Sequence, residues 1–404
     1  MLQIPIITMP DKVILAFSGG LDTSFCVKYL SDDRGLEVHT AIVNTGGFSA
    51  KELQEVEERA HMLGVASFTV LDQVRPYYEQ CLRYLLFGNV LKNDTYPLSV
   101  SAERTFQAMA IATHAKELGA KYIAHGSTGA GNDQVRFDLV FEVMAPGIEI
   151  ITPIRDLKLS REAEIEYLKE KGVVLEWSKA QYSINQGLWG TSVGGKETLN
   201  SWDTLPEEAW PTQLEKEGSE EVIIGFEKGE PVSINGTSYD HPVEAIEALQ
   251  ALAAPYAVGR DVHVGDTIIG IKGRVGFEAA APLILIKAHH LLEKHVLTKW
   301  QQHWKKQLSD WYGMMLHEAQ FLDPVMRNIE TFLTDTQQSV SGKVRVRLSP
   351  YQFVPLGIES EHDMMSAKFG TYGEMNRAWS GEHVKGFTKI LGIQGKLHRL
   401  VNEE

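Results

Sequence analysis

The sequence predicts a two-domain protein in which an α/β domain with a parallel sheet precedes a less regular α+β domain. In the first part, short apolar stretches alternate with stretches of helical spacing, the order that produces a parallel sheet. Beyond about residue 180, alternating stretches with a hairpin signal replace this order. With 404 residues the chain is long for one domain. We therefore expect domains over 1–173 and 174–370, followed by a C-terminal helical tail over 371–404.

A glycine turn follows the first predicted strand, Val13 to Phe17, and leads into helical spacing over Phe25 to Leu30. The turn, Ser18 to Ser24, has two glycines, whose backbone can approach a ligand closely, and three hydroxyl side chains. The free N–H groups at the start of the helix also favour an anion. A simpler interpretation is an ordinary turn capped by Asp22 or Thr23. Because capping alone does not require so many polar groups, we predict a phosphate site.

The remaining elements of the first domain place further loops at the same sheet edge. Glu37 to Asn44 is the second predicted strand and ends in Thr45-Gly46-Gly47. Ser49 and Glu52 predict a capping box at the start of the next helix, which Gly64 ends. Further strands are expected over Ser67 to Leu71 and Lys121 to His125, with a helix over Ser101 to Leu118 that ends at Gly119. Parallel sheets bind ligands at the carboxyl ends of their strands, so we expect a nucleotide crevice there.

The stretch HGSTGAGNDQVRF, residues 125–137, follows the fourth predicted strand. It combines three glycines with an Asn-Asp-x-x-Arg cluster at Asn132, Asp133 and Arg136. A flexible surface loop is the simpler interpretation. Amide, carboxylate and guanidinium groups together, however, offer matched donors and acceptors for a zwitterionic substrate, which we prefer.

The second part of the chain reads as an α+β domain. A helix is expected over Ser160 to Gly172, and Val173 to Ala180 is the expected crossover. Strands, a hairpin turn and a further helix follow over Glu221 to Glu227, Val232 to Ile234, Asn235-Gly236, Glu244 to Ala253 and Lys343 to Leu348.

An aromatic stripe at helical spacing runs between Ile284 and Met315 and includes Trp300, Trp304 and Trp311. We predict that it is mostly core and could continue into a subunit interface. Four histidines lie along it, at His289, His290, His295 and His303. Without cysteines or carboxylates at ligand spacing, we interpret them as hydrogen-bonded or solvated side chains, and not as metal ligands.

Composition narrows the class of protein. Lys plus Arg is 39 against 53 Asp plus Glu, a net charge of −14, which argues against a general nucleic-acid binder. Cys26 and Cys81 are the two cysteines, which excludes a disulfide framework and fits a reducing compartment. The N-terminal MLQIPIITMP lacks the features of a signal peptide, and no apolar run approaches the roughly 18 residues of a membrane span. We therefore expect a cytoplasmic protein.

The loop AFSGGLDTS resembles the pyrophosphatase loop of the PP-loop superfamily, whose members cleave ATP between the α and β phosphates. Together with HGSTGAGNDQVRF and YSINQGLWGTS, it resembles the argininosuccinate synthase family, and the resemblance covers most of the chain. It implies a PP-loop nucleotide-binding domain and a synthetase and multimerisation domain. It also implies that MgATP activates L-citrulline as citrullyl-AMP with release of pyrophosphate, and that the L-aspartate amine then displaces AMP.

The resemblance carries roles to matching positions. The residues expected to hold ATP are Ala16, Ser18, Gly19, Gly20, Leu21, Asp22, Thr23, Ser24, Val43 and Gly126. Those expected to hold aspartate are Thr128, Asn132 and Asp133, and those for citrulline are Tyr96, Ser101, Asn132, Arg136, Ser183 and Ser192. Asp22, Asp133 and Arg136 are the residues expected to take part in the chemistry. Two roles stay open for Asp22, orienting the loop or orienting the magnesium ion. No general base for the aspartate ammonium is evident.

The chain departs from the family at two positions. The family completes its citrulline site with a glutamate and a tyrosine, where this chain has Gly265 and Phe277. Asp266 and Glu278 are the adjacent carboxylates, and Asp266 is the candidate replacement. An offset of one residue along a strand nevertheless turns a side chain to the other face.

Four alternatives compete with this interpretation, and the sequence argues against the first two. An amidotransferase would need an N-terminal cysteine nucleophile, and a tRNA thiolase would need paired cysteines and a basic surface; this chain has none of these. Another PP-loop ligase with a different acceptor, and a nucleotide-binding regulator without catalysis, are both motivated by Gly265 and Phe277. The family is tetrameric and exchanges C-terminal helices, so Glu374 to Ile390 is expected to pack on a neighbouring subunit of a homotetramer.

Overall fold

A parallel sheet organises the first half of the protein. The computed structural model describes residues 10–173, 175, 177, 182–365, 372–374 and 378–403. The sheet has five strands in the order β3-β2-β1-β4-β5, all parallel. They are β1 (Lys12–Ala16), β2 (Glu37–Asn44), β3 (Ser67–Asp72), β4 (Tyr122–Ala124) and β5 (Glu149–Ile151). The predicted parallel sheet is confirmed, and β5 is an edge strand that the prediction lacked.

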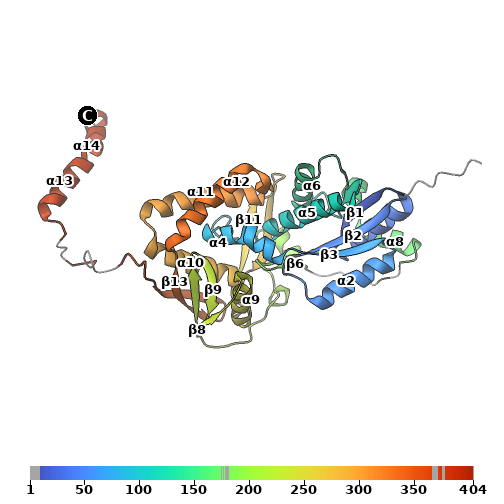
Figure 1. Ribbon diagram of the computed structural model, residues 1–404, viewed down its shortest axis with the longest axis horizontal. Helices are drawn as coiled ribbons and strands as arrows, with labels where there is room; N and C mark the ends of the chain where they lie inside the picture. The colour runs from blue at the N-terminus through green and yellow to red at the C-terminus, as the bar shows by residue number, and fades with distance from the viewer. Residues whose placement is uncertain are drawn as a thin grey trace, which may run out of the picture.

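Helices cover both faces of this sheet (Figure 1). Val13 and Leu15 of β1 pack with α1, α2 and α8, whereas Ile14 packs on the opposite face with α5 and α6. These helices are α1 (Leu21–Lys28), α2 (Ala50–Leu63), α5 (Ser99–Leu118), α6 (Asp133–Met144) and α8 (Arg161–Glu170). A π-helical turn (Tyr29–Asp33) follows α1, and the short α7 (Pro153–Leu157) precedes α8.

The predicted helix ends are confirmed where their capping residues are specific. Ser49 and Glu52 form the capping box of α2, and Gly64 ends that helix in the left-handed conformation with φ 85°. Gly119 ends α5 in the same way with φ 65°, and the Ser160 side chain caps α8. Local hydrogen bonding therefore sets the lengths of the helices that border the sheet.

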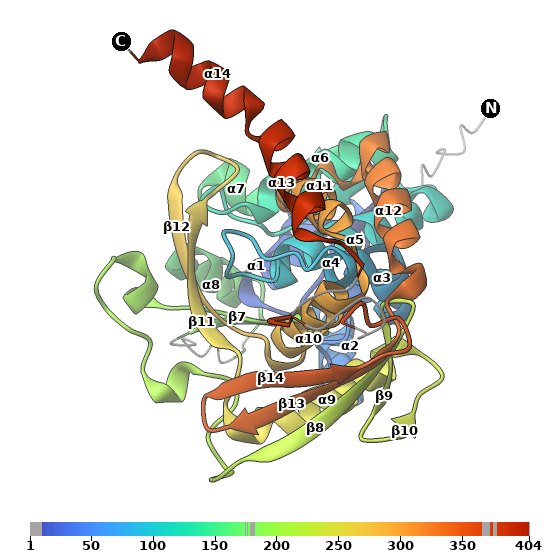
Figure 2. The ribbon, with the colours of Figure 1, turned by 90° about the vertical axis from the view of Figure 1, so that its left-hand side faces the viewer.

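The second half contains two antiparallel sheets, which confirms the α+β prediction (Figure 2). One has the order β10-β9-β8-β13-β14 and the other β11-β12-β7-β6. The strands of the first are β8 (Glu220–Glu227), β9 (Glu230–Ile234), β10 (Thr237–Ser238), β13 (Gly342–Ser349) and β14 (Gln352–Glu359). The strands of the second are β6 (Ser183–Gly187), β7 (Gly190–Gly194), β11 (Arg260–Asp266) and β12 (Lys272–Glu278). Asn235 and Gly236 form the predicted turn between β9 and β10, with φ 50° and 83°.

The helices of this half pack against the first antiparallel sheet and around its core. They are α9 (Pro242–Ala253), α10 (Ala280–Val296), α11 (Lys299–His317) and α12 (Pro324–Thr336). A segment from the first half joins the same core, although the sequence predicted no structure there. It consists of α3 (Val74–Tyr77), a π-helical turn (Tyr78–Leu82) and α4 (Arg83–Phe87).

The aromatic stripe is two helices, because the chain is extended at Leu297 between α10 and α11. Leu292 is fully buried, as predicted. The prediction that the stripe is mostly core is wrong for Trp300, Trp304 and Trp311, which are 63%, 56% and 59% exposed. Each lies on the side of α11 that faces away from the core.

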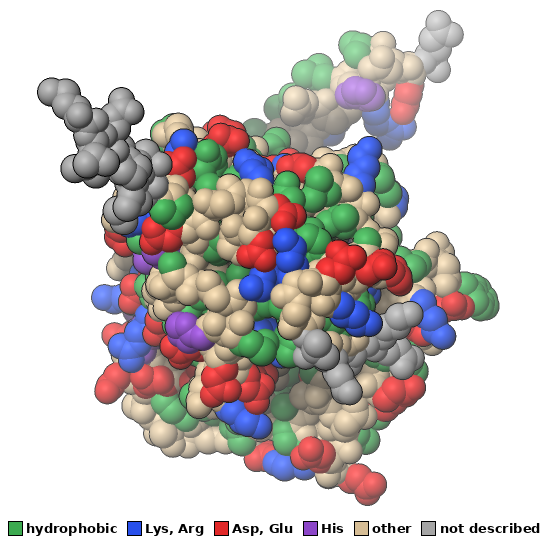
Figure 3. Space-filling view, turned by 90° about the vertical axis from the view of Figure 1, so that its right-hand side faces the viewer, with side chains coloured by type: hydrophobic (Ala, Val, Ile, Leu, Met, Phe, Trp, Pro, Cys, Tyr) green, Lys and Arg blue, Asp and Glu red, His purple; other side chains and the backbone are tan. Residues whose placement is uncertain are grey.

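The C-terminal helices α13 (Gly381–Leu391) and α14 (Ile393–Asn402) extend away from the rest of the protein (Figures 1 and 2). Helix α13 begins after its cap Ser380, not at Glu374, and residues 375–377 lie outside the described part of the chain. Much of the expected crossover between Val173 and Ala180 also lies outside it. No helix in the described ranges has both the length and the apolar character needed to span a membrane. On the face seen in Figure 3, acidic and basic side chains are interspersed.

Candidate functional site

A cavity of about 710 Å³ lies at the carboxyl ends of β1, β2 and β4. The loops after these strands, the start of α1, the middle of α5 and the hairpin β6–β7 all contribute to its wall. The predicted ATP residues in the wall are Ala16, Ser18, Gly20, Leu21, Asp22, Thr23, Val43 and Gly126. The predicted convergence of three strand ends is therefore present in the structure.

Gly19 and Ser24, the other two residues predicted to hold ATP, lie outside the cavity wall and support the loop from behind. Gly19 has φ 74°, and its carbonyl accepts a hydrogen bond from the guanidinium of Arg59 on α2. Ser24 is fully buried and donates to the carbonyl of Gly20 over 2.7 Å. Thr23 donates to the same carbonyl over 3.3 Å. These bonds hold the N-terminal N–H groups of α1 toward the cavity, where an anion would meet them.

Asp22 has a carboxyl neighbour that the sequence did not indicate. Glu164 of α8 is 3% exposed, and the negative charge of Asp22 acts on its carboxyl group. Burial, together with the negative charge of Asp22, raises the pKa of Glu164 to about 8, while Arg161 opposes the shift. Glu164 therefore carries a proton at neutral pH, which reduces the negative charge beside Asp22.

The loop after β4 is anchored by a buried histidine. His125 contacts Asp138 through Nε2 over 2.9 Å, and its Nδ1 accepts from the backbone N–H of Ser127 over 3.2 Å. Because Nδ1 accepts, Nε2 carries the proton and donates to Asp138, which also pairs with Arg155 over 2.5 Å. Thr128, a predicted aspartate residue, lies exposed farther along the loop and outside the cavity wall.

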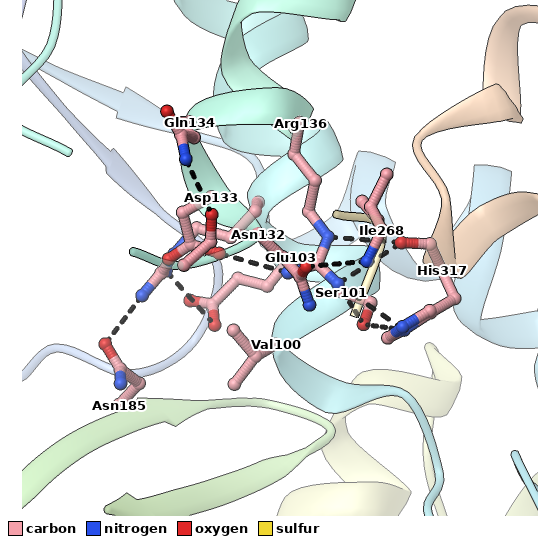
Figure 4. A network of polar contacts seen from close by, with 12 residues as sticks. Val100, Ser101, Glu103, Asn132, Asp133, Gln134, Arg136, Asn185, Ile268 and His317 are labelled. Atoms are coloured by element: carbon pink, nitrogen blue, oxygen red, sulfur yellow. Dashed lines mark hydrogen bonds and ion pairs between the residues drawn. The ribbon is translucent and has the colours of Figure 1, made fainter. Parts of the chain in front are cut away.

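Asp133, at the start of α6, lines the cavity and lies between two arginines (Figure 4). Its two oxygens accept from Arg104 Nε over 3.1 Å and from Arg136 over 3.0 Å. Burial alone would raise the pKa of Asp133, but the two guanidinium groups hold it below its ordinary value. Arg104 also donates to Asn185 of β6 over 2.6 Å, which joins the hairpin to the network.

The predicted citrulline residues Ser101 and Arg136 come together behind Asp133, where both are buried. Arg136 donates to Ser101 Oγ over 3.0 Å and to the carbonyl of His317 over 3.2 Å. Ser101 also contacts His317 Nδ1 over 2.9 Å. Burial, aided by the positive charge of Arg136, lowers the pKa of His317 to about 3, so this ring is neutral.

Tyr96 completes this buried group. Its hydroxyl lies 3.1 Å from Ser99 Oγ, and its ring centroid lies 5.3 Å from that of Phe277 and 5.1 Å from that of His263. Neither adjacent carboxylate replaces the missing glutamate at Gly265. Asp266 pairs with Lys272 at the surface over 2.6 Å, with its side chain 70% exposed, so the expectation for Asp266 is wrong.

Glu278 also points to other partners, because its carboxylate accepts hydrogen bonds from Arg260 over 3.1 Å and from Thr212 over 2.7 Å. The turn of the β11–β12 hairpin instead reaches the site through its backbone, because Ile268 N–H donates to Asn132 Oδ1 over 2.9 Å. Neither Asp266 nor Glu278 therefore supplies the carboxylate that the family has at the position of Gly265.

The two predicted serines of the second domain lie on β6 and β7. Ser192 is 6% exposed and accepts from Asn185 over 3.4 Å, so it is linked to Arg104 and Asp133. Ser183 is exposed at the start of β6, two residues before Asn185 on the same side of the strand. The structure thus brings Ser192 to the network and leaves Ser183 at its border.

Sequence reasoning missed several charged residues of this site, among them Glu52 and Arg161, which also line the cavity. Glu103 and Arg104 line the cavity from α5, and Glu164 lies behind Asp22. Glu103 and Arg104 follow Ser101 on α5, and Glu164 lies on the mostly exposed α8, but the sequence alone did not show that these charged side chains turn toward the site.

Comparison with known proteins finds matches to one family over nearly the whole chain. Residues 12–174 match the family model described as the arginosuccinate synthase N-terminal HUP domain, and residues 182–398 match its C-terminal domain. An argininosuccinate synthase of Dictyoglomus thermophilum is 38% identical over 392 residues, covering 96% of this chain and 98% of the relative. That of Methanocaldococcus jannaschii is 35% identical over 395 residues, covering 97% and 99%. That of Xanthomonas campestris is 36% identical over 403 residues, covering 96% and 98%.

Proposed function

The chain belongs to the argininosuccinate synthase family, and from this membership we propose that the cavity at the strand ends holds its three substrates. The protein is an AMP-forming carbon–nitrogen ligase. It converts ATP, L-citrulline and L-aspartate to argininosuccinate, AMP and pyrophosphate through citrullyl-AMP. The observation that carries the placement is that the loops after β1, β2 and β4 line one cavity together with Asp133.

In the first step, the loop Ser18 to Ser24 binds the β and γ phosphates, and Ala16, Val43 and Gly126 contact the nucleoside. The ureido oxygen of citrulline attacks the α phosphorus, and pyrophosphate leaves. The N–H groups at the start of α1 are already oriented toward the charge that develops on pyrophosphate, so they stabilise it without reorganisation. This preorganisation is supported by the bonds of Thr23 and Ser24 to Gly20.

Magnesium would accompany the triphosphate. Hard oxygen donors suit Mg²⁺, which binds through one or two carboxylates plus substrate phosphates. Asp22 and the hydroxyls of Ser18 and Thr23 line the cavity and form such a donor set. Bound there, the ion would neutralise phosphate charge.

In the second step, aspartate lies between Thr128, Asn132 and Asp133, and citrulline is bound by Tyr96, Ser101, Arg136, Ser183 and Ser192. Support comes from the continuous hydrogen-bonded chain that runs from Asn185 through Arg104, Asp133 and Arg136 to Ser101 (Figure 4). Because the Arg136 guanidinium is buried behind Asp133, citrulline binding requires Arg136 to exchange part of its contact with His317 for the substrate.

The remaining assignments follow from the family. We propose a cytoplasmic homotetramer with the boundaries 1–173, 174–370 and 371–404. The exposed apolar side chains of α13 and α14 favour packing on a neighbouring subunit; Phe387, Ile390 and Leu400 are 63%, 70% and 77% exposed. Two buried free cysteines suit a reducing compartment.

One assay tests the function. The protein is incubated with MgATP, citrulline and aspartate, and AMP, pyrophosphate and argininosuccinate are followed. Citrulline-dependent pyrophosphate release and aspartate-dependent argininosuccinate formation are expected. Pyrophosphate release with a different acceptor would indicate a related ligase, and ATP binding without release would indicate the non-catalytic regulator that Gly265 and Phe277 motivated.

A further inference from the structure

Glu103 is a buried carboxylate in the wall of the cavity, and it is not among the residues proposed to bind the three substrates. It lies on α5, is 3% exposed, and lines the cavity together with Asp133 (Figure 4). Oε1 accepts hydrogen bonds from Thr45 Oγ1 over 2.5 Å and from Gln107 Nε2 over 3.1 Å. One oxygen of the carboxylate is therefore fixed by two donors.

The second oxygen is held much more loosely. Within the described ranges, the one charged group within 4 Å of Oε2 is an Arg104 nitrogen at 3.7 Å, which is too far for a hydrogen bond. Arg104 directs its donors to Asp133, Gln107 and Asn185. Glu103 Oε2 is thus available to a substrate, while the rest of the carboxylate is locked.

The hairpin β6–β7 closes one side of this carboxylate. A Cβ added at Gly187 would lie 3.2 Å from both Cδ and Oε2 of Glu103, so a side chain there would crowd the carboxylate. The absence of a side chain lets the hairpin backbone cover the carboxylate while the cavity side stays open. This geometry restricts approach to Oε2 to the cavity, where Asp133 also points.

The two carboxylates of the cavity differ in their affinity for a proton. Burial, with a contribution from the charge of Asp133, raises the pKa of Glu103, whereas Arg104 and Thr45 act in the opposite direction. Asp133 is held ionised by its arginines. Burial and, to a smaller extent, the charge of Glu103 raise the pKa of Tyr77 and Tyr96, which are both neutral phenols. When the pKa values of two carboxylates in one site differ in this way, the group with the raised pKa, here Glu103, is suited to accept a proton. The other, here Asp133, stays a fixed negative charge.

Building on the function proposed above, we propose that Glu103 is the general base of the second step and takes the proton from the α-ammonium of aspartate. Once the ammonium is neutralised, its nitrogen lone pair forms a bond to the ureido carbon of citrullyl-AMP. The carbon–oxygen bond to AMP then breaks, and AMP leaves with that electron pair. The nitrogen sheds its remaining surplus proton to the departing phosphate, and Glu103 returns its own proton to solvent.

The Glu103→Gln variant tests this step, because it keeps the size and the contacts of the side chain and removes the base. Citrulline-dependent exchange of labelled pyrophosphate into ATP measures the first step without aspartate, and single-turnover argininosuccinate formation measures the second. We expect exchange within about threefold of the unmodified protein and a second step slowed by about 10² to 10⁴-fold. Glu117→Gln, an exposed position on the same helix, is the matched control and should change neither rate.

A structural role for Glu103 would give a different pattern. If both steps fall together in Glu103→Gln, or if neither changes, the proposal is wrong. Loss of citrulline-dependent exchange in the unmodified protein would instead overturn the proposed function, and the Glu103 step with it.

A second variant keeps the proposal testable if Glu103→Gln does not fold. The hydrogen bond from Thr45 lowers the pKa of Glu103, so Thr45→Val should shift the acidic limb of the second-step pH profile to higher pH. An unshifted limb in folded Thr45→Val would contradict the assignment.

Discussion

Removing the charge of Asp133 tests whether this carboxylate stabilises the two guanidinium groups of Arg104 and Arg136. In Asp133→Asn the shape of the side chain is kept, but Arg104 and Arg136 lose their shared anion. Arg136 is 3% exposed, and the side chain of Arg104 is 15% exposed, so water screens their mutual repulsion poorly. We expect both lower stability and weaker aspartate binding.

The size of the effect follows from the contacts. Asp133 accepts two charge-assisted hydrogen bonds, over 3.0 and 3.1 Å, and such bonds contribute about 1.5 to 3 kcal/mol each. Since the side chain of Asp133 is itself 38% exposed, we take the lower end, a loss of about 3 kcal/mol in the free energy of unfolding. The folded-state pKa of Asp133 lies below its unfolded value, so this stabilisation is present at neutral pH and is lost as the pH falls through the folded-state pKa.

Urea unfolding at pH 7.5 and the KM for aspartate are the measurements. Glu142→Gln, an exposed carboxylate on the same helix, serves as the control and should lie within about 0.5 kcal/mol of the unmodified protein. Unfolding energy equal to that of the control, together with an aspartate KM within about twofold, would refute the role given to Asp133.

Three further predictions concern other parts of the molecule. Asp22→Ala should abolish pyrophosphate release and leave the far-UV circular dichroism unchanged, and normal turnover would disprove the role given to the loop. Gly47→Ala should raise the KM for ATP at least tenfold, because its Cβ would lie 1.9 Å from the carbonyl oxygen of Gln186 and displace the hairpin; an unchanged KM would contradict this. Burial lowers the pKa of His289 from 6.5 to about 4. Between these two pH values the unfolded state binds more protons than the folded state. The free energy of unfolding therefore falls as the pH falls through this range, by about 3 kcal/mol in total. His289→Gln should remove most of this loss when urea unfolding at pH 7.5 and 4.5 is compared, and an equal loss in both proteins would count against it.

Elements with specific end signals could be predicted closely from the sequence. Ser49, Glu52 and Gly64 fixed both ends of α2, and the Asn235-Gly236 turn located the β9–β10 hairpin. These signals are local hydrogen bonds and backbone conformations, so they need no knowledge of the tertiary structure.

Elements that depend on tertiary packing were missed. Helix α6 begins inside the Asn132–Arg136 motif, which resembled a loop because its polar residues serve the site and not a helix face. The exposed tryptophans of α11 have helical spacing, but spacing alone cannot say whether a partner covers that face of the helix.

The candidate site likewise contains some residues that local sequence signals indicated and others that depend on tertiary packing. Glycines and hydroxyls in a strand-to-helix turn indicate an anion site, so the sequence could identify the loop after β1 as part of the cavity wall. Glu103, by contrast, acquires its properties from burial against Thr45 and the backbone of Gly187, which lie far from it in sequence. A charge on a helix gains a distinctive proton affinity only when other elements desolvate it.

The departures at Gly265 and Phe277 are also explained by packing. A Cβ added at Gly265 would lie 2.5 Å from Nε2 of His263, so the imidazole occupies the space that a side chain at Gly265 would need. The same imidazole stacks on Tyr96 with an interplanar angle of 25°, and Phe277 packs against Tyr96 as well. Since burial lowers the pKa of His263, the surroundings of Tyr96 are neutral and aromatic where a carboxylate would be charged. Glycine, histidine and phenylalanine therefore form one interlocking unit around Tyr96, and a change at any one position constrains the other two.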